Sequence, residues 1–140
     1  MSLFSSLRNV GSLPVEGHVP GFDGATGWLN SPPLAAADLR GKVVLVDFWT
    51  YTCINWHRTL AYVRAWAEKY QDQGLVVVGV HTPEFPFERD IDNVRWAANE
   101  MRVEYPVALD SDYAIWRAFP MLARRLHRRR ARPNPAPPVR

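Results

Sequence analysis

One apolar run, Val43 to Trp49, constrains the fold of this 140-residue chain more than any other feature. The run is nearly continuous and rich in β-branched residues, which is typical of a strand buried on both faces, as in a parallel sheet. A second run of the same kind spans Leu75 to Val80. Between them, residues 53–70 carry apolar side chains at helical spacing and are followed by Gly74, a residue type common just beyond helix ends. This order predicts a βαβ unit with a right-handed crossover.

The segment before this unit has a different composition. Residues 1–40 are rich in Gly, Pro, Ser and Ala, which predicts a lead-in loop segment with one short helical turn near residues 35–39. We therefore expect the domain itself to occupy residues 41–119. The chain length fits one domain of this kind and not two.

Weaker patterns follow the second strand. A second amphipathic helix is predicted over about residues 88–101, with an inner face formed by Ile91, Val94, Ala98 and Met101. Residues 105–109 include a proline, which is tolerated at a sheet edge, and predict a short edge strand. Residues 112–119 predict one or two helical turns. Together these patterns indicate an α/β fold.

The charge of the chain is concentrated at its C-terminal end. The net charge is +3, yet residues 121–140 contain seven arginines and no acidic residue, so the rest of the chain is mildly acidic. We interpret residues 120–140 as a disordered tail rich in Arg and Pro. The arginines at 124–130 could contact nucleic acid or anionic lipid, but such runs are more often solvated. Nucleic-acid binding by the body of the domain is therefore not expected.

Composition excludes several classes of protein. Hydrophobic residues make up 47% of the chain, which is enough for a packed core, and no apolar run approaches the roughly 20 residues that cross a bilayer. The first residues do not have the pattern of a secretory signal. Cys53 is the single cysteine, which excludes an internal disulfide and a cysteine-rich zinc site. Histidines are scattered without ligand spacing, so neither a metal nor another cofactor is expected.

Cys53 is the first candidate for chemistry. It follows the predicted strand and opens the predicted helix, where free N–H groups and the helix dipole favour a thiolate. A strand-to-helix turn also holds the sulfur at the carboxyl edge of the sheet, where α/β folds bind ligands. The alternative is that Cys53 is simply a small buried side chain.

Several segments around Cys53 resemble one family. The stretch from Lys42 to Trp56, KVVLVDFWTYTCINW, resembles the active-site segment of thioredoxin-like proteins. It is most similar to the redoxin domains related to TlpA, and in particular to the DipZ class associated with cytochrome c biogenesis. The resemblance covers about residues 13–119. Further stretches that match the family in order are residues 34–40, 62–70, 79–85, 90–94 and 105–119.

The resemblance assigns roles to three residues. It implies that Cys53 is the nucleophile, that Asp47 is the buried acid that assists proton transfer, and that Trp49 shields the thiol. A carboxyl group in an apolar strand is costly unless it is paired or neutral, so we expect the pKa of Asp47 to be raised. The residues alone favour a plainer reading, in which Asp47 ends a strand and bonds to backbone.

Two departures from the family pattern limit what this chain can do. The family has a second, resolving cysteine three residues after the first, and here that position is Trp56, a second residue that can shield the thiol. After Phe119 the family continues with a cis-proline loop, a hairpin and a helix, and none is recognisable here. We therefore expect a thioredoxin-like α/β/α fold that is truncated after its βαβα part. Losing the hairpin would leave the strand at 43–49 with an open edge.

His57 is a possible partner of the thiolate. It lies four residues after Cys53, on the same face of the predicted helix. As an imidazolium it would stabilise a thiolate, but an exposed histidine without a role explains the spacing equally well.

These observations lead to one functional hypothesis and one alternative. The hypothesis is a degenerate thiol–disulfide oxidoreductase domain limited to monothiol chemistry at Cys53, with protein or small-molecule thiols and disulfides as partners. The alternative is a catalytically inactive interaction module or a truncated gene remnant. Self-association through the open sheet edge is a further expectation. The chain as it stands suggests the cytoplasm, whereas the family is usually extracytoplasmic and membrane-attached.

Overall fold

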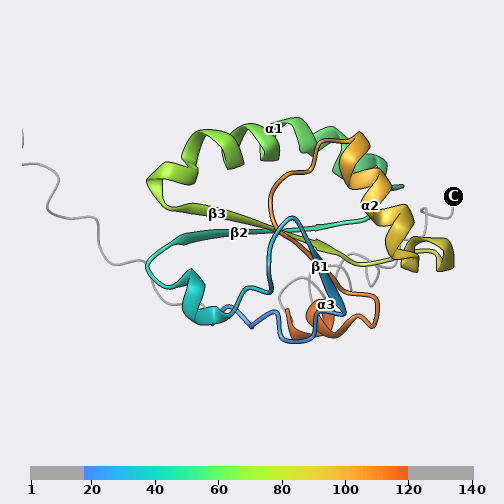
Figure 1. The fold of residues 1–140 in the computed structure, drawn as a ribbon, viewed down its shortest axis with the longest axis horizontal. Coiled ribbons are helices and arrows are strands. Elements are labelled where there is room, and N and C mark those ends of the chain that lie inside the picture. Colours follow the sequence, from blue (N-terminus) through green and yellow to red (C-terminus); the bar gives the residue numbers. More distant parts are fainter. Residues whose placement is uncertain (1–17, 120–140) are drawn as a thin grey trace, which may run out of the picture.

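A computed structural model describes residues 18–119, and the expectations for residues 1–17 and for the Arg/Pro tail at 120–140 lie outside the described residues. The described part forms three layers around one mixed sheet whose strand order is β1-β4-β3-β2. Figure 1 shows α1 and α2 on one side of this sheet and α3 on the other. The predicted α/β class is therefore confirmed.

The βαβ unit agrees closely with the prediction. Strand β2 (Val43–Trp49) pairs in parallel with β3 (Leu75–His81), and the register places Val43 opposite Leu75 and Trp49 opposite His81. Helix α1 (Ile54–Tyr70) connects them and is followed by a short 3₁₀ turn, η2 (Gln71–Gln73). Gly74 then has a φ of 91°, a conformation that a side chain would disfavour.

The other half of the sheet corrects two predictions. Strand β4 (Val107–Leu109) pairs in parallel with β3 and antiparallel with β1 (Gly27–Leu29). The expectation of an edge strand at 105–109 was therefore wrong, because β1 covers its outer side. The reading of residues 1–40 as a loop segment was also wrong at β1, which the Gly- and Pro-rich composition around it concealed. Within the described residues, β2 is an outer strand of the sheet.

Short helices complete the two outer layers. The helical turn expected near residues 35–39 is η1 (Ala36–Leu39), and the one expected at 112–119 is α3 (Ala114–Ala118). The helix predicted over about 88–101 is split into η3 (Pro86–Arg89) and α2 (Ile91–Glu100). Val94 and Ala98 face the core as expected, but Ile91 is 41% exposed because it lies in the first turn of α2.

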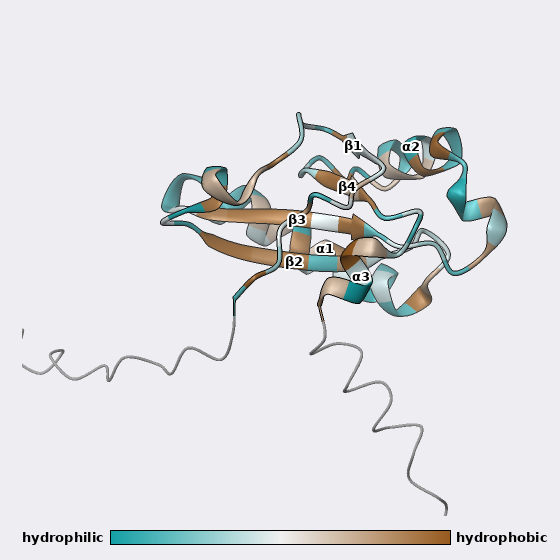
Figure 2. Ribbon diagram, turned by 90° about the horizontal axis from the view of Figure 1, so that it is seen from below, coloured by the Kyte–Doolittle hydropathy of each residue, from teal (hydrophilic) through white to brown (hydrophobic). Residues whose placement is uncertain are grey.

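The core consists of two clusters separated by the sheet. Figure 2 shows the apolar character of β2 and β3, whose alternating side chains enter both clusters. The cluster under α1 contains Trp49, Trp56 and Tyr105. Gly79 permits their close packing, since a Cβ there would lie 2.9 Å from both Trp49 Nε1 and a ring carbon of Tyr105. The sequence therefore places a cluster of aromatic side chains beneath the N-terminal half of α1.

Among residues 18–119, no helix is both long enough and apolar enough to cross a bilayer.

Candidate thiol site

Cys53 lies where β2 turns into α1. The turn is closed by a hydrogen bond from the Cys53 N–H to the carbonyl of Thr50 (3.0 Å), and Cys53 is the N-cap residue of α1. Cys53 is a free cysteine, and the residue is partly exposed. The predicted position at a helix start is thus confirmed, and the free N–H groups of the first turn lie next to the sulfur-bearing residue.

Trp56 occupies the position where the family pattern has its second cysteine. Its side chain is only 4% exposed and stacks on Trp49, with ring centroids 4.4 Å apart and planes inclined by 22°. Its Nε1–H donates a hydrogen bond to Asp47 Oδ2 at 3.0 Å. Trp56 is therefore an integral part of the core, and its role in shielding the thiol stays a prediction.

Asp47 is held by two donors beneath the first turn of α1. Besides Trp56, the hydroxyl of Tyr105 donates to Asp47 Oδ2 at 3.5 Å. Burial raises the pKa of Asp47, and the two hydrogen bonds offset this only in part. This agrees with the expectation from the sequence. Burial and the charge of Asp47 in turn raise the pKa of Tyr105, which keeps its hydroxyl protonated as a donor. Among the described residues, Asp47 has no hydrogen bond to Cys53. The role of Asp47 in proton transfer to or from Cys53 therefore stays a prediction.

His57 is anchored to the same turn as Cys53. Its Nε2 lies 2.6 Å from the carbonyl oxygen of Tyr51, so Nε2 carries the proton and donates it to this bond. The ring also packs edge-on against Trp56, with centroids 5.4 Å apart. His57 is exposed, and its hydrogen bond to Tyr51 sets the orientation of the ring. A contact between His57 and the Cys53 thiolate remains a prediction.

Glu88 supports the turn at residues 50–53 that carries Cys53, here called the thiol turn, and sequence reasoning missed it. It is fully buried and accepts hydrogen bonds from the Thr52 hydroxyl and from the N–H groups of Glu84 (2.7 Å) and Phe85 (3.0 Å). Burial alone would raise the pKa of Glu88, but these hydrogen bonds outweigh it and the pKa lies below its ordinary value. The carboxylate therefore ties the turn at 84–85 to the turn that carries Cys53. A Glu three residues after the helix N-cap is a known capping signal and could have indicated this role.

His81 is a second buried group that the sequence did not single out. It ends β3, is 2% exposed, and packs edge-on against Trp49 and parallel to Tyr51. Burial lowers the pKa of His81 to about 4, although the negative charge of Glu88 acts to raise it. The ring is therefore neutral at physiological pH. A neutral imidazole here packs as an aromatic side chain beneath the thiol turn.

Exposed apolar side chains surround this turn. Phe85 and Phe87 are 50% and 54% exposed and stack on each other at 5.6 Å. The Tyr51 hydroxyl donates to the Phe87 carbonyl at 3.3 Å, which joins this pair to the thiol turn. Ile54, the residue after Cys53, is 61% exposed. We call Tyr51, Ile54, Phe85 and Phe87 the apolar rim.

Residues 18–119 contain no group of three or more His, Cys, Asp or Glu side chains placed to hold a metal ion.

Comparison with known proteins agrees with this geometry. The sequence profile of the AhpC/TSA family matches residues 16–133, a range that extends beyond the predicted 41–119 domain at both ends. The chain belongs to the AhpC/TSA family. It is 32% identical to the thiol-disulfide oxidoreductase YkuV of Bacillus subtilis over 101 residues, which is 72% of this chain and 68% of YkuV.

Two further relatives define the type of domain. The chain is 50% identical over 103 residues to protein DipZ of Mycobacterium tuberculosis, and it spans 15% of the length of that protein. It is 31% identical to a thioredoxin-like protein whose solution structure was solved in the oxidised form, with a TM-score of 0.61 over 68% of this chain and 64% of that one. The fold is therefore thioredoxin-like, and the domain is of the thiol–disulfide oxidoreductase type, as the resemblance implied.

Proposed function

We propose that this domain forms mixed disulfides through Cys53 and cannot resolve them internally. The observation that carries the proposal is the pairing of a partly exposed thiol at the N-cap of α1 with a buried, hydrogen-bonded Trp56 three residues later. The first feature favours a nucleophilic sulfur, and the second replaces the thiol that would release it.

The reaction follows from one sulfur atom. The Cys53 thiolate attacks one sulfur of a disulfide, an S–S bond forms between Cys53 and that sulfur, and the original S–S bond breaks to release the other sulfur as a thiolate. The step conserves electrons between the two disulfides. With Trp56 in place of a cysteine, a second thiol must come from a separate molecule, such as glutathione, to release the adduct.

The apolar rim supports a protein partner. Phe85, Phe87 and Ile54 present exposed apolar surface next to the thiol turn, and such surface beside a reactive group is typical of a binding site for polypeptide. A disulfide flanked by apolar residues would bury part of this surface on reaction. We therefore expect protein disulfides with apolar neighbours to react more readily than glutathione disulfide.

Mass spectrometry of the intact protein tests the proposal. The full chain is incubated at neutral pH with a disulfide-bonded peptide that carries apolar residues beside its cysteine. We expect one covalent peptide adduct that persists until dithiothreitol is added, and none with Cys53→Ser. The matched control is Cys53→Ser/Ser31→Cys, which moves the single thiol to a partly exposed loop position outside any helix N-terminus. An adduct that forms no faster at Cys53 than in Cys53→Ser/Ser31→Cys would overturn the proposal.

One observation favours an inactive interaction module as the second candidate. The Asp47 carboxylate is engaged by Trp56 and Tyr105, which is an arrangement suited to stability and not to proton transfer. In that case the apolar rim would bind its partner without a covalent step. Binding of the same peptide by Cys53→Ser, with an affinity equal to that of the unmodified chain and no adduct in the latter, would favour this candidate.

We also propose that the protein self-associates through the outer edge of β2. In the described residues β2 pairs on one side only, with β3, and Val43 is 69% exposed. A strand with unpaired N–H and C=O groups and apolar side chains tends to pair with another strand. The partner we expect is the β2 strand of a second copy.

A further inference from the structure

A pocket of about 890 Å³ lies away from the thiol turn, between the C-terminal half of α1 and the loop that follows α2. Its apolar floor includes Leu75 and Val77 of β3, and Ala61 of α1 also lines it. Its size falls in the range of small-molecule sites, which combine apolar walls with a few convergent polar groups. None of the residues used in the thiol chemistry above, apart from the supporting Tyr105, contributes to this pocket.

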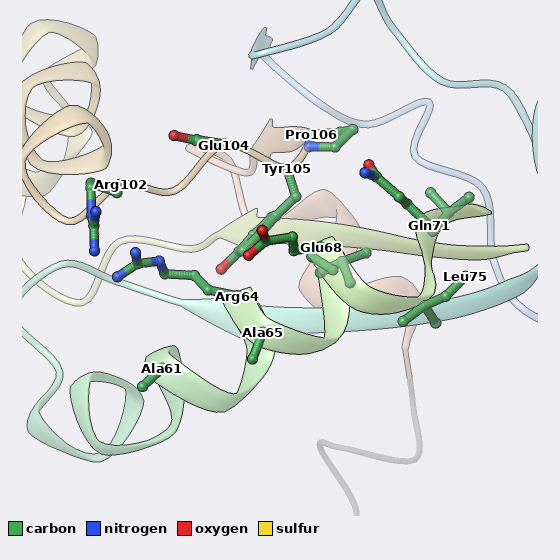
Figure 3. Close-up of a pocket in the computed structure, with 13 residues that line it drawn as sticks. Ala61, Arg64, Ala65, Glu68, Gln71, Leu75, Arg102, Glu104, Tyr105 and Pro106 are labelled. Carbon is green, nitrogen blue, oxygen red and sulfur yellow. The ribbon is translucent and has the colours of Figure 1, made fainter. Parts of the chain in front are cut away.

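Two arginines converge on one end of the pocket. Figure 3 shows the side chains of Arg64, from α1, and Arg102, from the loop, reaching the same end. Among the described residues the one ion pair is between Arg95 and Asp92, so no described carboxylate lies within 4.0 Å of either guanidinium. Two guanidinium groups at one end of a pocket, neither in ion-pair contact with a described carboxylate, can bind an anion, since their paired N–H donors match a carboxylate.

The backbone at Arg102 supports a specific role for this side chain. Arg102 follows the C-cap of α2, and the N–H groups of Arg102 and Val103 close the helix on the carbonyls of Asn99 and Ala98 (3.1 and 2.8 Å). This is the position where helices usually carry glycine, and Arg102 has a φ of 52°. A positive φ is unfavourable for a residue with a side chain, and the Arg102 side chain lines the pocket.

The two acidic residues of the pocket limit the kind of ligand. Glu68 and Glu104 also line it, so that the four charged side chains sum to zero. The pocket therefore has no net positive charge to attract a polyanion, whereas a single carboxylate can lie at the arginine end while an apolar chain covers Leu75 and Val77. We infer that this pocket binds a small monocarboxylate with an apolar chain, held by Arg64 and Arg102.

The test uses the full chain and simple carboxylates at constant ionic strength. Titration calorimetry with acetate, butyrate and hexanoate is expected to show saturable binding of one molecule, strengthened by about threefold to fourfold for each methylene buried on the apolar floor. Hexanamide, which has the same apolar chain without the charge, is expected not to bind measurably. Equal affinities for acetate and hexanoate, or equal binding of hexanamide and hexanoate, would overturn the inference.

Variants identify the site. Arg64→Gln and Arg102→Gly are each expected to weaken hexanoate binding by about tenfold or more, because each removes a charge-assisted pair of hydrogen bonds. Arg102→Gly also relieves the backbone at a positive φ, so it should fold at least as stably as the unmodified chain and its loss of binding cannot be assigned to unfolding. Glu68→Gln is expected to strengthen binding by removing a repelling charge.

Arg58→Gln is the matched control, because Arg58 is exposed on the same helix and does not line the pocket. It should bind hexanoate as the unmodified chain does. Undiminished binding in both Arg64→Gln and Arg102→Gly would show that hexanoate binds elsewhere and would contradict the assignment. Because Cys53 lies outside this pocket, the test is independent of the proposed thiol chemistry.

Discussion

Replacing Trp56 by phenylalanine tests the most unusual feature of the site, the hydrogen bond between an indole and a buried carboxylate. The change keeps an aromatic ring against Trp49 but removes the Nε1–H that lies 3.0 Å from Asp47 Oδ2. Hydrogen bonds to charged groups contribute about 1.5–3 kcal/mol, and the smaller ring adds about 1 kcal/mol of lost packing. We therefore expect Trp56→Phe to lower the free energy of unfolding at neutral pH by about 2.5–4 kcal/mol.

Trp49→Phe is the matched control for this experiment. Trp49 is 3% exposed, comparable to Trp56, and within the described residues its Nε1 has no hydrogen-bond partner. The same atoms are removed, but no hydrogen bond is lost and a buried unpaired donor disappears. We expect a change of about 1 kcal/mol or less, because the loss of packing and the removal of the unpaired donor oppose each other. Urea unfolding of both variants measures the difference.

The pH dependence gives the experiment a second, independent readout. The hydrogen bond from Trp56 lowers the pKa of Asp47, so its loss raises a folded-state pKa that burial already places above the ordinary value of 3.8. The ionised form of Asp47 is therefore penalised further in the variant. The difference in the free energy of unfolding between Trp56→Phe and the unmodified chain should be largest at pH values well above the folded-state pKa of Asp47. It should shrink as the pH falls through that pKa. Equal destabilisation by Trp56→Phe and Trp49→Phe, or a pH-independent difference, would refute the reasoning.

Three other predictions address the site and the sheet edge. Trp56→Cys restores the family spacing and should allow a disulfide with Cys53 and exchange with glutathione. Insulin reduction by this variant should stay orders of magnitude slower than reduction by thioredoxins, because catalysis also needs a positioned substrate. Insulin turnover at a thioredoxin rate would contradict this prediction. Glu88→Gln should lower the free energy of unfolding by about 1–3 kcal/mol at neutral pH. The loss should fade as the pH falls through the folded-state pKa of Glu88, which lies below the ordinary 4.5. A constant loss of stability down to low pH would show that the charge of Glu88 is not responsible. Sedimentation velocity should show dimers that Val43→Lys shifts towards monomers, and a monomer at high concentration would mean that the edge of β2 is covered.

The sequence predicted the elements whose patterns are long and local. The runs at 43–49 and 75–80 and the helix between them were recognisable because buried parallel strands are apolar throughout and the helix repeats its apolar face. The same reasoning missed β1, Gly27–Leu29, which is only three residues long and exists because it pairs with β4 some 80 residues later. It consequently placed residues 105–109 at the edge of the sheet. No local pattern reports a pairing of this kind.

The site shows the same division between local and long-range information. The position of Cys53 at a helix start follows from local sequence, and the raised pKa of Asp47 follows from its apolar surroundings. The hydrogen bond from Trp56 to Asp47 and the support from Tyr105 and Glu88 depend on side-chain packing between distant segments. The sequence could identify Trp56 as a departure from the family pattern, but not as a buried partner of the acid beneath it.

The central claim is that Cys53 forms a disulfide that the domain cannot release by itself. Its most direct measurement is the lifetime of a peptide adduct at Cys53, followed by intact-protein mass spectrometry after excess peptide has been removed. We predict an adduct that remains intact in buffer without thiol for as long as the protein stays folded, and that is released in proportion to added glutathione. Failure of Cys53 to form the adduct, or its release at a rate independent of added thiol, would contradict the claim.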